Sequence, residues 1–222
     1  MDKVRLIDIK KTILSDNYDL AAEIRQELRQ NGVFMLNIMA SPGAGKTSLI
    51  IETLRRMKEK YHFAVIEGDI ESQVDAEKVA KEGVSAVQLR TGGSCHLDAP
   101  MIKEALKKID LSATDVILIE NIGNLVCPAD FDLGQTRKAM VLSVPEGDDK
   151  ALKYPLMFSV SDLLVVSKTD YLEYSDFNYE ALKERSEKLN PQLKIIKTSA
   201  KTGEGLEDFC LWLQEEIEAA RN

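Results

Sequence analysis

Short apolar runs separated by segments of helical spacing constrain the fold of this chain more than any other feature. Seven such runs occur along the sequence, at residues 33–39, 63–68, 85–90, 115–121, 138–144, 162–168 and 193–199. The last four are continuous rather than alternating, which is typical of strands covered on both faces. We therefore expect an α/β fold with a doubly wound, mostly parallel sheet, helices on both faces, and ligands at the carboxyl ends of the strands.

The segment ASPGAGKTS, residues 40–48, joins the first apolar run to a segment of helical spacing. Backbone amides at such a junction can surround phosphate oxygens. The Lys46 ammonium would reach the β- and γ-phosphates, and the Thr47 hydroxyl would ligate magnesium. Ala40 stands where the usual pattern has glycine, so we expect that the turn there needs no positive φ. A chance glycine-rich turn is the alternative, but the position between strand and helix favours a P-loop NTPase. The predicted nucleotide contacts are Gly43, Ala44, Gly45, Lys46, Thr47 and Ser48.

Two later loops favour guanine over adenine as the base. Residues 167–170, SKTD, resemble the Asn-Lys-x-Asp motif of GTP-binding proteins, with Ser167 in place of asparagine. Asp170 would accept two adjacent N–H groups of guanine, while the Lys168 stem would cover the ring. We expect the shorter Ser167 to weaken a bridge that asparagine supplies. An exposed turn with ordinary charges is the alternative for Lys168 and Asp170 taken alone. The segment TSAKTGEG resembles the Ser-Ala-Lys loop of the same proteins, which predicts contacts from Ser199, Ala200 and Lys201.

Magnesium prefers hard oxygen ligands, so carboxylates at strand ends are its predicted partners. Asp69 follows the second run, and Glu120 lies at the end of DVILIE within the fourth. With Lys46 and Thr47 they form the predicted catalytic set, and with Thr47 the predicted magnesium site. A helix cap or a solvated loop acid is the alternative for each, and Glu67 and Asp75 are lesser candidates.

The segment ENIG, residues 120–123, resembles the Asp-x-x-Gly switch of GTPases. Gly123 would place a backbone amide near the γ-phosphate. The next residue is Asn124, where small signalling GTPases commonly have a water-orienting glutamine. We therefore expect slow intrinsic hydrolysis of GTP, with turnover gated by assembly.

Three soft or borderline ligands lie in the loops after the third and fourth runs. Cys95 and His96 are adjacent, and Cys127 follows Glu120 by a short loop. Thiolate and imidazole suit nickel or zinc, so these residues are the predicted transition-metal site, shared across a symmetric dimer. The alternative is that Cys127 is a small buried apolar residue, Cys95 a loop thiol and His96 a helix-capping or surface group. Cys210 lies among Leu206, Phe209 and Leu213 at helical spacing and is expected in the core.

Taken in order, these motifs resemble the HypB family of nickel-incorporation GTPases, P-loop proteins of the signal-recognition/MinD/BioD class. The resemblance also rests on GDIESQVDAEKV, VPEGDDK and ENIGNLVCPADFDLG, and it covers nearly the whole chain. It implies a metallochaperone that supports nickel insertion into a nickel-iron hydrogenase precursor. It also implies GTP-dependent dimerisation with Cys95, His96 and Cys127 at the interface. The implied cofactors are GTP or GDP, Mg²⁺, and Ni²⁺ or Zn²⁺.

The implied partners are a second copy of the chain, a small nickel-binding maturation protein and the hydrogenase large-subunit precursor. The first thirty residues contain no Cys or His, so delivery rather than storage of nickel is expected. A formal net charge of −8 argues against nucleic-acid or anionic-membrane surfaces. No apolar leader or membrane-spanning stretch is visible, which predicts a cytoplasmic protein.

The N-terminal segment, residues 1–32, is expected to be an amphipathic helix packed on a GTP-binding domain, residues 33–222. Ser15, Asp16 and Asn17 are its predicted caps, and Gly32 its stop. Its apolar face would carry Leu20, Ile24 and Leu28.

Three other functions stay open. A regulatory GTP-binding module could use the thiols for structure or redox sensing, and a urease-type nickel GTPase would place its ligands as Cys-Pro-His. A protein-targeting GTPase would need a methionine-rich helix, whereas the methionines here are scattered. Lys153, after the acidic turn of GDDK, is a dimer or nucleotide contact or, as the alternative, a solvated helix charge.

Overall fold

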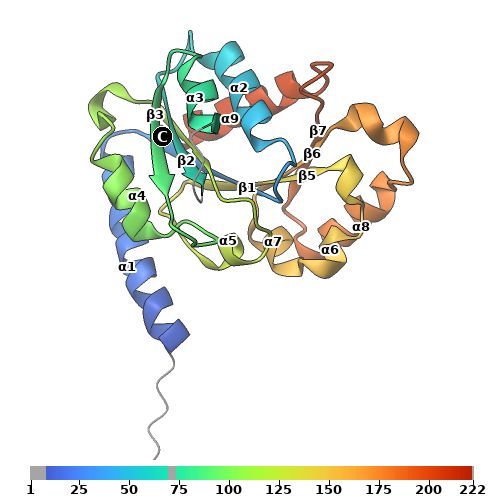
Figure 1. The fold of residues 1–222 in the computed structure, drawn as a ribbon, viewed down its shortest axis with the longest axis horizontal. Helices are drawn as coiled ribbons and strands as arrows, with labels where there is room; N and C mark the ends of the chain where they lie inside the picture. Colours follow the sequence, from blue (N-terminus) through green and yellow to red (C-terminus); the bar gives the residue numbers. More distant parts are fainter. Residues whose placement is uncertain (1–8, 70–73, 222) are drawn as a thin grey trace, which may run out of the picture.

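The computed structural model describes residues 9–69 and 74–221, and within them a single sheet of seven strands forms the centre of the molecule (Figure 1). The order is β3-β2-β4-β1-β5-β6-β7, and every neighbouring pair is parallel. The expected doubly wound α/β architecture is confirmed, and the sheet is parallel throughout. The strands are β1 (Phe34–Ala40), β2 (Phe63–Asp69), β3 (Ser85–Arg90), β4 (Val116–Glu120), β5 (Arg137–Ser143), β6 (Leu163–Ser167) and β7 (Lys194–Lys197).

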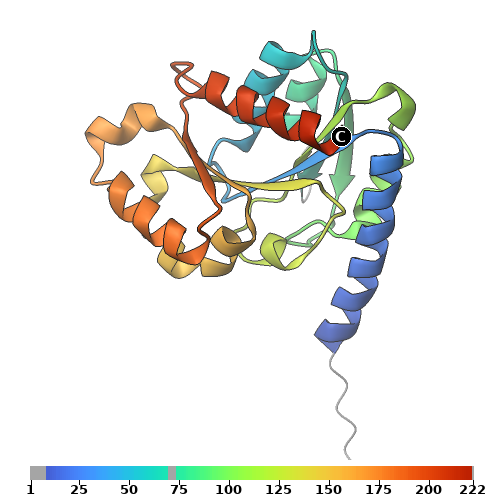
Figure 2. The same cartoon turned by 180° about the vertical axis from the view of Figure 1, so that it is seen from behind.

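Helices cover both faces of the sheet (Figure 1, Figure 2). One face carries α2 (Lys46–Met57), α3 (Val74–Ala80) and α9 (Leu206–Arg221). The other carries α1 (Ile9–Gln30), α4 (Ala99–Leu106), α5 (Cys127–Asp130), α6 (Lys150–Lys153), α7 (Pro155–Val160) and α8 (Tyr179–Leu189). Three short 3₁₀ turns complete the described elements, at Leu111–Ala113, Val144–Glu146 and Thr169–Tyr174.

Strand β1 shows why continuous apolar runs form this sheet. Its residues are buried along the whole strand. Phe34 and Leu36 pack in the layer with α2 and α9, whereas Met35 packs with α1 and α4. Because successive side chains point to opposite faces, a strand covered on both sides is apolar at almost every position. The exception in β1 is Asn37, which is fully buried and accepts a hydrogen bond from the Asn121 amide.

The central place of β1 brings several strand ends to the P-loop. Strand β4 lies beside β1, with Ile38 opposite Glu120, and β2 lies on the other side of β4, with Glu67 opposite Glu120. In a parallel sheet all carboxyl ends lie at one edge. The carboxyl ends of β1, β2 and β4 therefore lie beside the same space.

Helix α1 differs from the expectation at its start, because it begins at Ile9 and not at the predicted caps Ser15, Asp16 and Asn17. Asn17 is 4% exposed, and its side chain has partners outside the helix. Its amide donates to the Asp132 carbonyl at 2.7 Å and accepts from the Ala99 backbone N–H at 2.8 Å. A polar residue inside a helix is stable when tertiary hydrogen bonds satisfy it.

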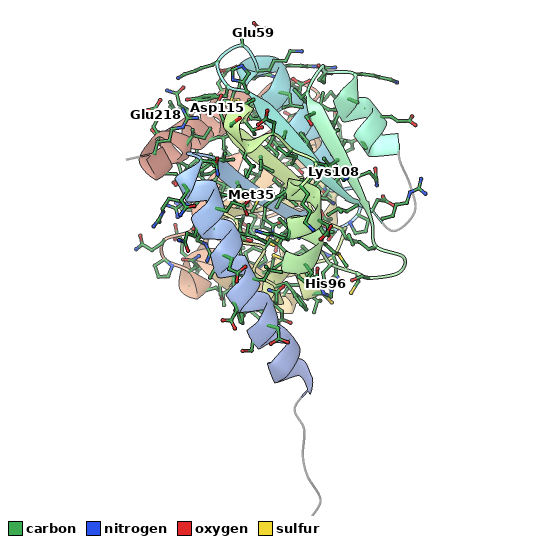
Figure 3. All side chains as sticks on the ribbon, turned by 90° about the vertical axis from the view of Figure 1, so that its left-hand side faces the viewer. Met35, Glu59, His96, Lys108, Asp115 and Glu218 are labelled. Atoms are coloured by element: carbon green, nitrogen blue, oxygen red, sulfur yellow. The ribbon has the colours of Figure 1, made fainter. Side chains whose placement is uncertain are left out.

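The other expectations for α1 agree with the structure. Ile24 and Leu28 are buried against α4 and the sheet, and Leu20 packs at the edge of the same cluster. Gly32, with φ 68°, follows the end of the helix. Figure 3 shows α1 beside α4, with His96 close to one end of α4. In the part of the chain that the structure describes, no helix is long and apolar enough to cross a membrane.

Candidate nucleotide and metal sites

The P-loop lies between the end of β1 and the start of α2. Ala40 is the last residue of β1 and pairs with Val141, so it is extended, and the expectation that it needs no positive φ is confirmed. Gly45, with φ 103°, precedes the first residue of α2, Lys46. The Lys46 side chain is buried at the mouth of the loop, with 7% exposure. The backbone amides at the start of α2 therefore face the space where phosphate groups would lie.

A cavity of about 540 Å³ opens between the P-loop and the ends of β2 and β4. Lys46, Thr47, Asp69 and Glu120 all line it. The Thr47 hydroxyl donates to Glu120 Oε1 at 2.9 Å. The structure thus brings together the four residues that the sequence predicts as the catalytic set, at the edge where the carboxyl ends of the strands meet.

Glu67 also lines this cavity and lies one strand away from Glu120, with which it is in register. Both carboxylates are buried, at 3% and 6% exposure. A hydroxyl and several carboxylates form a set of hard oxygen donors, which fits a magnesium ion. The side chain of Asp75, the other lesser candidate, lies outside the described residues.

Gly123 lies directly against the P-loop. A Cβ atom at this position would come within 2.9 Å of the Pro42 Cα and backbone nitrogen. No larger residue fits without moving one of the two loops. The β4–α5 loop, residues 121–126, therefore touches the phosphate-binding loop at the position that the sequence assigns to the γ-phosphate.

The loop after β6 is tied to the P-loop by two side chains. The Ser167 hydroxyl donates to the Ala44 carbonyl at 2.6 Å, and Lys168 Nζ donates to the Gly43 carbonyl at 2.8 Å. Ser167 therefore bridges directly to the P-loop. Its effect on the strength of nucleotide binding stays a prediction. Lys168 itself has φ 58°, the left-handed conformation.

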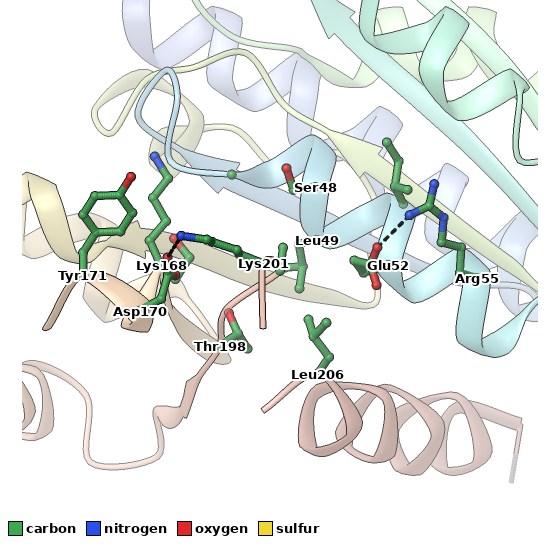
Figure 4. Close-up of a pocket in the computed structure, with 14 residues that line it drawn as sticks. Ser48, Leu49, Glu52, Arg55, Lys168, Asp170, Tyr171, Thr198, Lys201 and Leu206 are labelled. Carbon is green, nitrogen blue, oxygen red and sulfur yellow. Dashed lines mark hydrogen bonds and ion pairs between the residues drawn. The ribbon is translucent and has the colours of Figure 1, made fainter. Parts of the chain in front are cut away.

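A second cavity, of about 510 Å³, lies between this loop and α2 (Figure 4). Asp170, Ala200 and Lys201 line it, while Ser199 is fully buried behind them. The Ser199 hydroxyl donates to Asp170 Oδ1 at 2.7 Å, and Lys201 Nζ lies 3.8 Å from Asp170 Oδ2. Ser199 thus positions the carboxylate that would read the base.

Cys95, His96 and Cys127 come together on the other side of the β4–α5 loop. One ligand atom of each lies within 4.8 Å of the others. The Cys95 and Cys127 sulfurs are 3.2 Å apart, and Cys95 Sγ lies 3.8 Å from His96 Nδ1. Strand β2 separates β3 from β4, so the loop after β3 reaches past it to bring Cys95 to Cys127.

The surroundings of the cluster suit a metal ligand set. The His96 ring stacks on Phe131 with centroids 3.8 Å apart, and burial lowers the pKa of the imidazole against the opposing effect of Asp98 and Asp130. The neutral ring, which ligates metals, is thereby favoured. The hydrogen bond shared with Cys95 raises the pKa of the Cys127 thiol, and burial raises it further. A bound cation would have to displace that proton.

Asn124 connects the two ligand-bearing loops, which the sequence did not indicate. Its side-chain amide donates to the Cys95 carbonyl at 3.2 Å, and its oxygen accepts from the Val126 backbone N–H at 2.9 Å. The sequence associated this position only with hydrolysis. A contact of this kind depends on which loops meet in space, and no local pattern signals it.

Two other predicted residues lie away from these cavities. Lys153 pairs with Asp149 of the preceding turn at 2.5 Å and is exposed, which agrees with a solvated helix charge. Cys210 is buried in α9 between Phe209 and Leu213, as expected for a core residue. Burial raises the pKa of the Cys210 thiol to about 11.

A phosphate loop between the first strand and a helix, in a parallel sheet of this order, defines a P-loop nucleotide-binding protein. Residues 34–197 match the nucleotide-binding domain of the CobW/HypB/UreG family. Within that group, this chain belongs to the HypB family.

Curated relatives and solved structures agree on the family. The chain is 45% identical to hydrogenase maturation factor HypB of Rhizobium leguminosarum, covering 100% of this chain and 73% of the relative. It is 43% identical to hydrogenase/urease maturation factor HypB of Helicobacter pylori, covering 94% and 87%.

The crystal structure of HypB from Helicobacter pylori in complex with nickel has a TM-score of 0.88 at 41% identity, covering 93% of this chain and 97% of that one. The hydrogenase maturation factor HypB from Archaeoglobus fulgidus gives 0.86 at 41%, covering 92% and 100%. The signal recognition particle receptor FtsY from Elizabethkingia anophelis, at 16% identity with a TM-score of 0.55, shares the fold alone.

Proposed function

We propose that this chain is a GTP-hydrolysing metallochaperone whose nucleotide state controls a nickel or zinc site. One observation carries the proposal. The segment that begins at Glu120, bonded to Thr47 of α2, ends at Cys127 in the Cys–His–Cys cluster. A change at the γ-phosphate therefore has a short path to a metal ligand.

Guanine is the base that the second cavity supports best. Asp170 is held by Ser199 with its carboxylate at the wall of the cavity, where it can accept two N–H groups of guanine. Adenine offers no such pair of donors on that edge. Ala200 and Lys201 would complete the base contacts, and Gly43 to Ser48 with Gly123 the phosphate contacts.

Thr47, Glu120 and Asp69 would hold Mg²⁺, which when bound offsets charge on the phosphate oxygens. Lys46 would lie against the β- and γ-phosphates. The Asn124 amide is bonded to the Cys95 carbonyl rather than directed at the P-loop, which supports slow intrinsic hydrolysis. Turnover that is fast at low protein concentration and independent of that concentration would contradict this part.

Cys95, His96 and Cys127 offer three ligands, and a tetrahedral or square-planar ion needs four. Cys95 is exposed and Val126, beside Cys127, is 55% exposed, so the cluster lies at the surface. We infer that a second copy of the chain or water completes the coordination, and that GTP favours the dimer. Residues 33–221 would form the GTP-binding domain and residues 9–32 an added helix, while residues 1–8 and 222 of the predicted segments lie outside the described residues.

The client is proposed from the relatives. Their names include hydrogenase maturation, which supports a hydrogenase large-subunit precursor as acceptor and a small nickel-binding maturation protein as partner. The Helicobacter relatives are also named for urease, so urease maturation is the alternative. The 3.2 Å separation of the Cys95 and Cys127 sulfurs also favours one rival function, a redox-regulated GTP-binding module.

Equilibrium dialysis with nickel and with zinc tests the proposal. The protein is measured with GDP and with a non-hydrolysable GTP analogue, and its oligomeric state is recorded in each. We expect one stoichiometric site per cluster with an affinity that depends on the nucleotide. Cys95→Ala and Cys127→Ala should lose the ion, and Cys210→Ala, which removes a core thiol, should keep it. Equal retention in all three variants would overturn the metallochaperone function and favour the redox module.

A further inference from the structure

The β4–α5 loop is fixed at both ends but not in the middle. At one end, Asn121 is 1% exposed and its side chain bonds Asn37 at 3.1 Å. At the other, Leu125 is buried in the cluster with α7 and α8. Gly123 and Asn124, between these anchors, are only half-buried. These two residues are therefore the part of the loop that can change position without disrupting the core.

The same two residues contact the two sites on either side of the loop. Gly123 packs on Pro42 of the P-loop, at a distance that leaves no room for a Cβ atom. Asn124 follows it directly and bonds the loop that carries Cys95. If Gly123 is displaced relative to Pro42, Asn124 must move with it, because the two residues are covalently adjacent.

The two hydrogen bonds of Asn124 end beside the two thiols. Its amide N–H donates to the carbonyl of Cys95 itself, and its oxygen accepts from the N–H of Val126, the neighbour of Cys127. One planar side chain therefore relates the positions of both sulfurs, which are 3.2 Å apart. If the side chain moves, at least one bond must lengthen, and the spacing of the sulfurs changes with it.

We propose that Asn124 is the positioning residue that couples nucleotide state to metal affinity, through its bonds to the Cys95 carbonyl and the Val126 N–H. The inference rests on the proposed function, because it assigns the coupling of the two sites to a single side chain. It also gives this residue a role other than the orientation of water at the position after the switch glycine.

The test compares the wild type with Asn124→Ala, which loses both bonds, and with Asn124→Asp, which keeps the acceptor for Val126 and loses the donor to Cys95. Asn31→Asp is the matched control, since Asn31 makes one side-chain bond, to the Glu27 carbonyl at the exposed end of α1. Nickel and zinc affinities are measured in the full chain with GDP and with the GTP analogue. Thiolate-to-nickel charge-transfer absorption reports whether both sulfurs still bind.

For each metal, we compare the affinity measured with GDP with the affinity measured with the GTP analogue. We expect the ratio of these two affinities to approach one in both Asn124 variants. The ratio should fall about 3- to 10-fold from its wild-type value, the range that one or two hydrogen bonds support. The charge-transfer band should persist, and Asn31→Asp should keep the wild-type ratio. By linkage, metal should then also lose its effect on nucleotide affinity.

Three outcomes would overturn the inference. If both Asn124 variants keep the wild-type ratio, another contact carries the coupling. If metal affinity falls equally with both nucleotides, Asn124 only builds the cluster. If the wild type binds metal with equal affinity in GDP and in the GTP analogue, the coupling in the proposed function fails as well. A wild-type affinity ratio of one identifies that case. If only Asn124→Ala loses the charge-transfer band, its sulfurs no longer bind nickel normally. The affinity ratio of Asn124→Asp then decides the test.

Discussion

The Ser167 hydroxyl reaches the Ala44 carbonyl at 2.6 Å and so joins the end of β6 to the P-loop. This bond makes the base-reading loop and the phosphate-binding loop one unit. Its removal should affect nucleotide binding without touching Asp170. We expect Ser167→Ala to weaken binding of GTP and of GDP about 3- to 10-fold, the effect of one buried hydrogen bond.

Isothermal titration with both nucleotides measures this effect. Ser175→Ala is the control, because Ser175 follows the 3₁₀ turn Thr169–Tyr174 after β6 and its hydroxyl bonds the nearby Leu172 carbonyl. Unchanged affinity in Ser167→Ala would show that the Lys168 bond to Gly43 alone holds the two loops together.

The bond between Thr47 and Glu120 predicts which carboxylate matters for magnesium. Glu120→Gln keeps the shape of the side chain and removes its charge. We expect a higher magnesium requirement for nucleotide binding and a fall in the hydrolysis rate of roughly 100-fold. The neighbouring Glu67→Gln should have a smaller effect, since Glu67 lies on β2, one strand further from the P-loop strand β1 than Glu120. Magnesium titrations of GTP hydrolysis compare the two variants, and a larger effect of Glu67→Gln would reverse the assignment.

Gly123→Ala should push the β4–α5 loop away from the P-loop. The added methyl group would lie within 2.9 Å of Pro42 backbone atoms. Overpacking of this kind costs about 1–3 kcal/mol. We expect Gly123→Ala to lose more affinity for the GTP analogue than for GDP, because the contact lies at the predicted γ-phosphate position. Gly83→Ala, which meets nothing within 4 Å but has φ +81°, reports backbone strain alone. Equal loss of both nucleotides would place the γ-phosphate elsewhere.

The three thiols should differ in reactivity. Cys95 is exposed, Cys127 is partly exposed, and Cys210 is buried with a pKa raised to about 11. Because the thiolate is the nucleophile, iodoacetamide at pH 8 should label the exposed Cys95 first and Cys127, whose pKa is raised, more slowly, and it should leave Cys210 unmodified in the folded protein. Nickel or zinc should protect the first two, and a chelator should restore their labelling. Peptide mass spectrometry reads each site separately, and labelling that ignores metal would contradict the proposed ligands.

Cys210 also predicts a stability change at alkaline pH. Burial favours the neutral thiol, so the pKa is raised from 9.0 to about 11. The associated stability is fully present below pH 9 and is lost as the pH rises towards 11, because the unfolded chain releases its proton first. The loss amounts to about 2–3 kcal/mol. Denaturant unfolding of the wild type and Cys210→Ala between pH 8 and 11 should show a steeper decline in the wild type. Parallel declines would exclude the thiol as the cause.

The strands and the P-loop could be predicted because both depend on local sequence. Continuous apolar runs form buried strands. The glycine-rich segment that ends with Gly45 and Lys46 predicts a turn after the first strand and the start of a helix. Asn17 was misread as a cap because its partners, Ala99 and Asp132, lie far along the chain. The bonds of Ser167 and Asn124 escaped prediction for the same reason, since they depend on which loops the strand order brings together.

The position of Asn17 has a consequence for the order in which this protein is assembled. Its amide bonds Asp132, which is 115 positions further along the chain, and it also bonds Ala99 just after His96. The ribosome synthesises α1 early. The Asn17 bonds to Ala99 and Asp132 can both form only after more than half of the 222 residues have been synthesised. Until then the loop of Cys95 and His96 has neither Cys127 nor its support from Asn124. The nascent chain can therefore complete its metal ligands only late, after the first four strands have emerged.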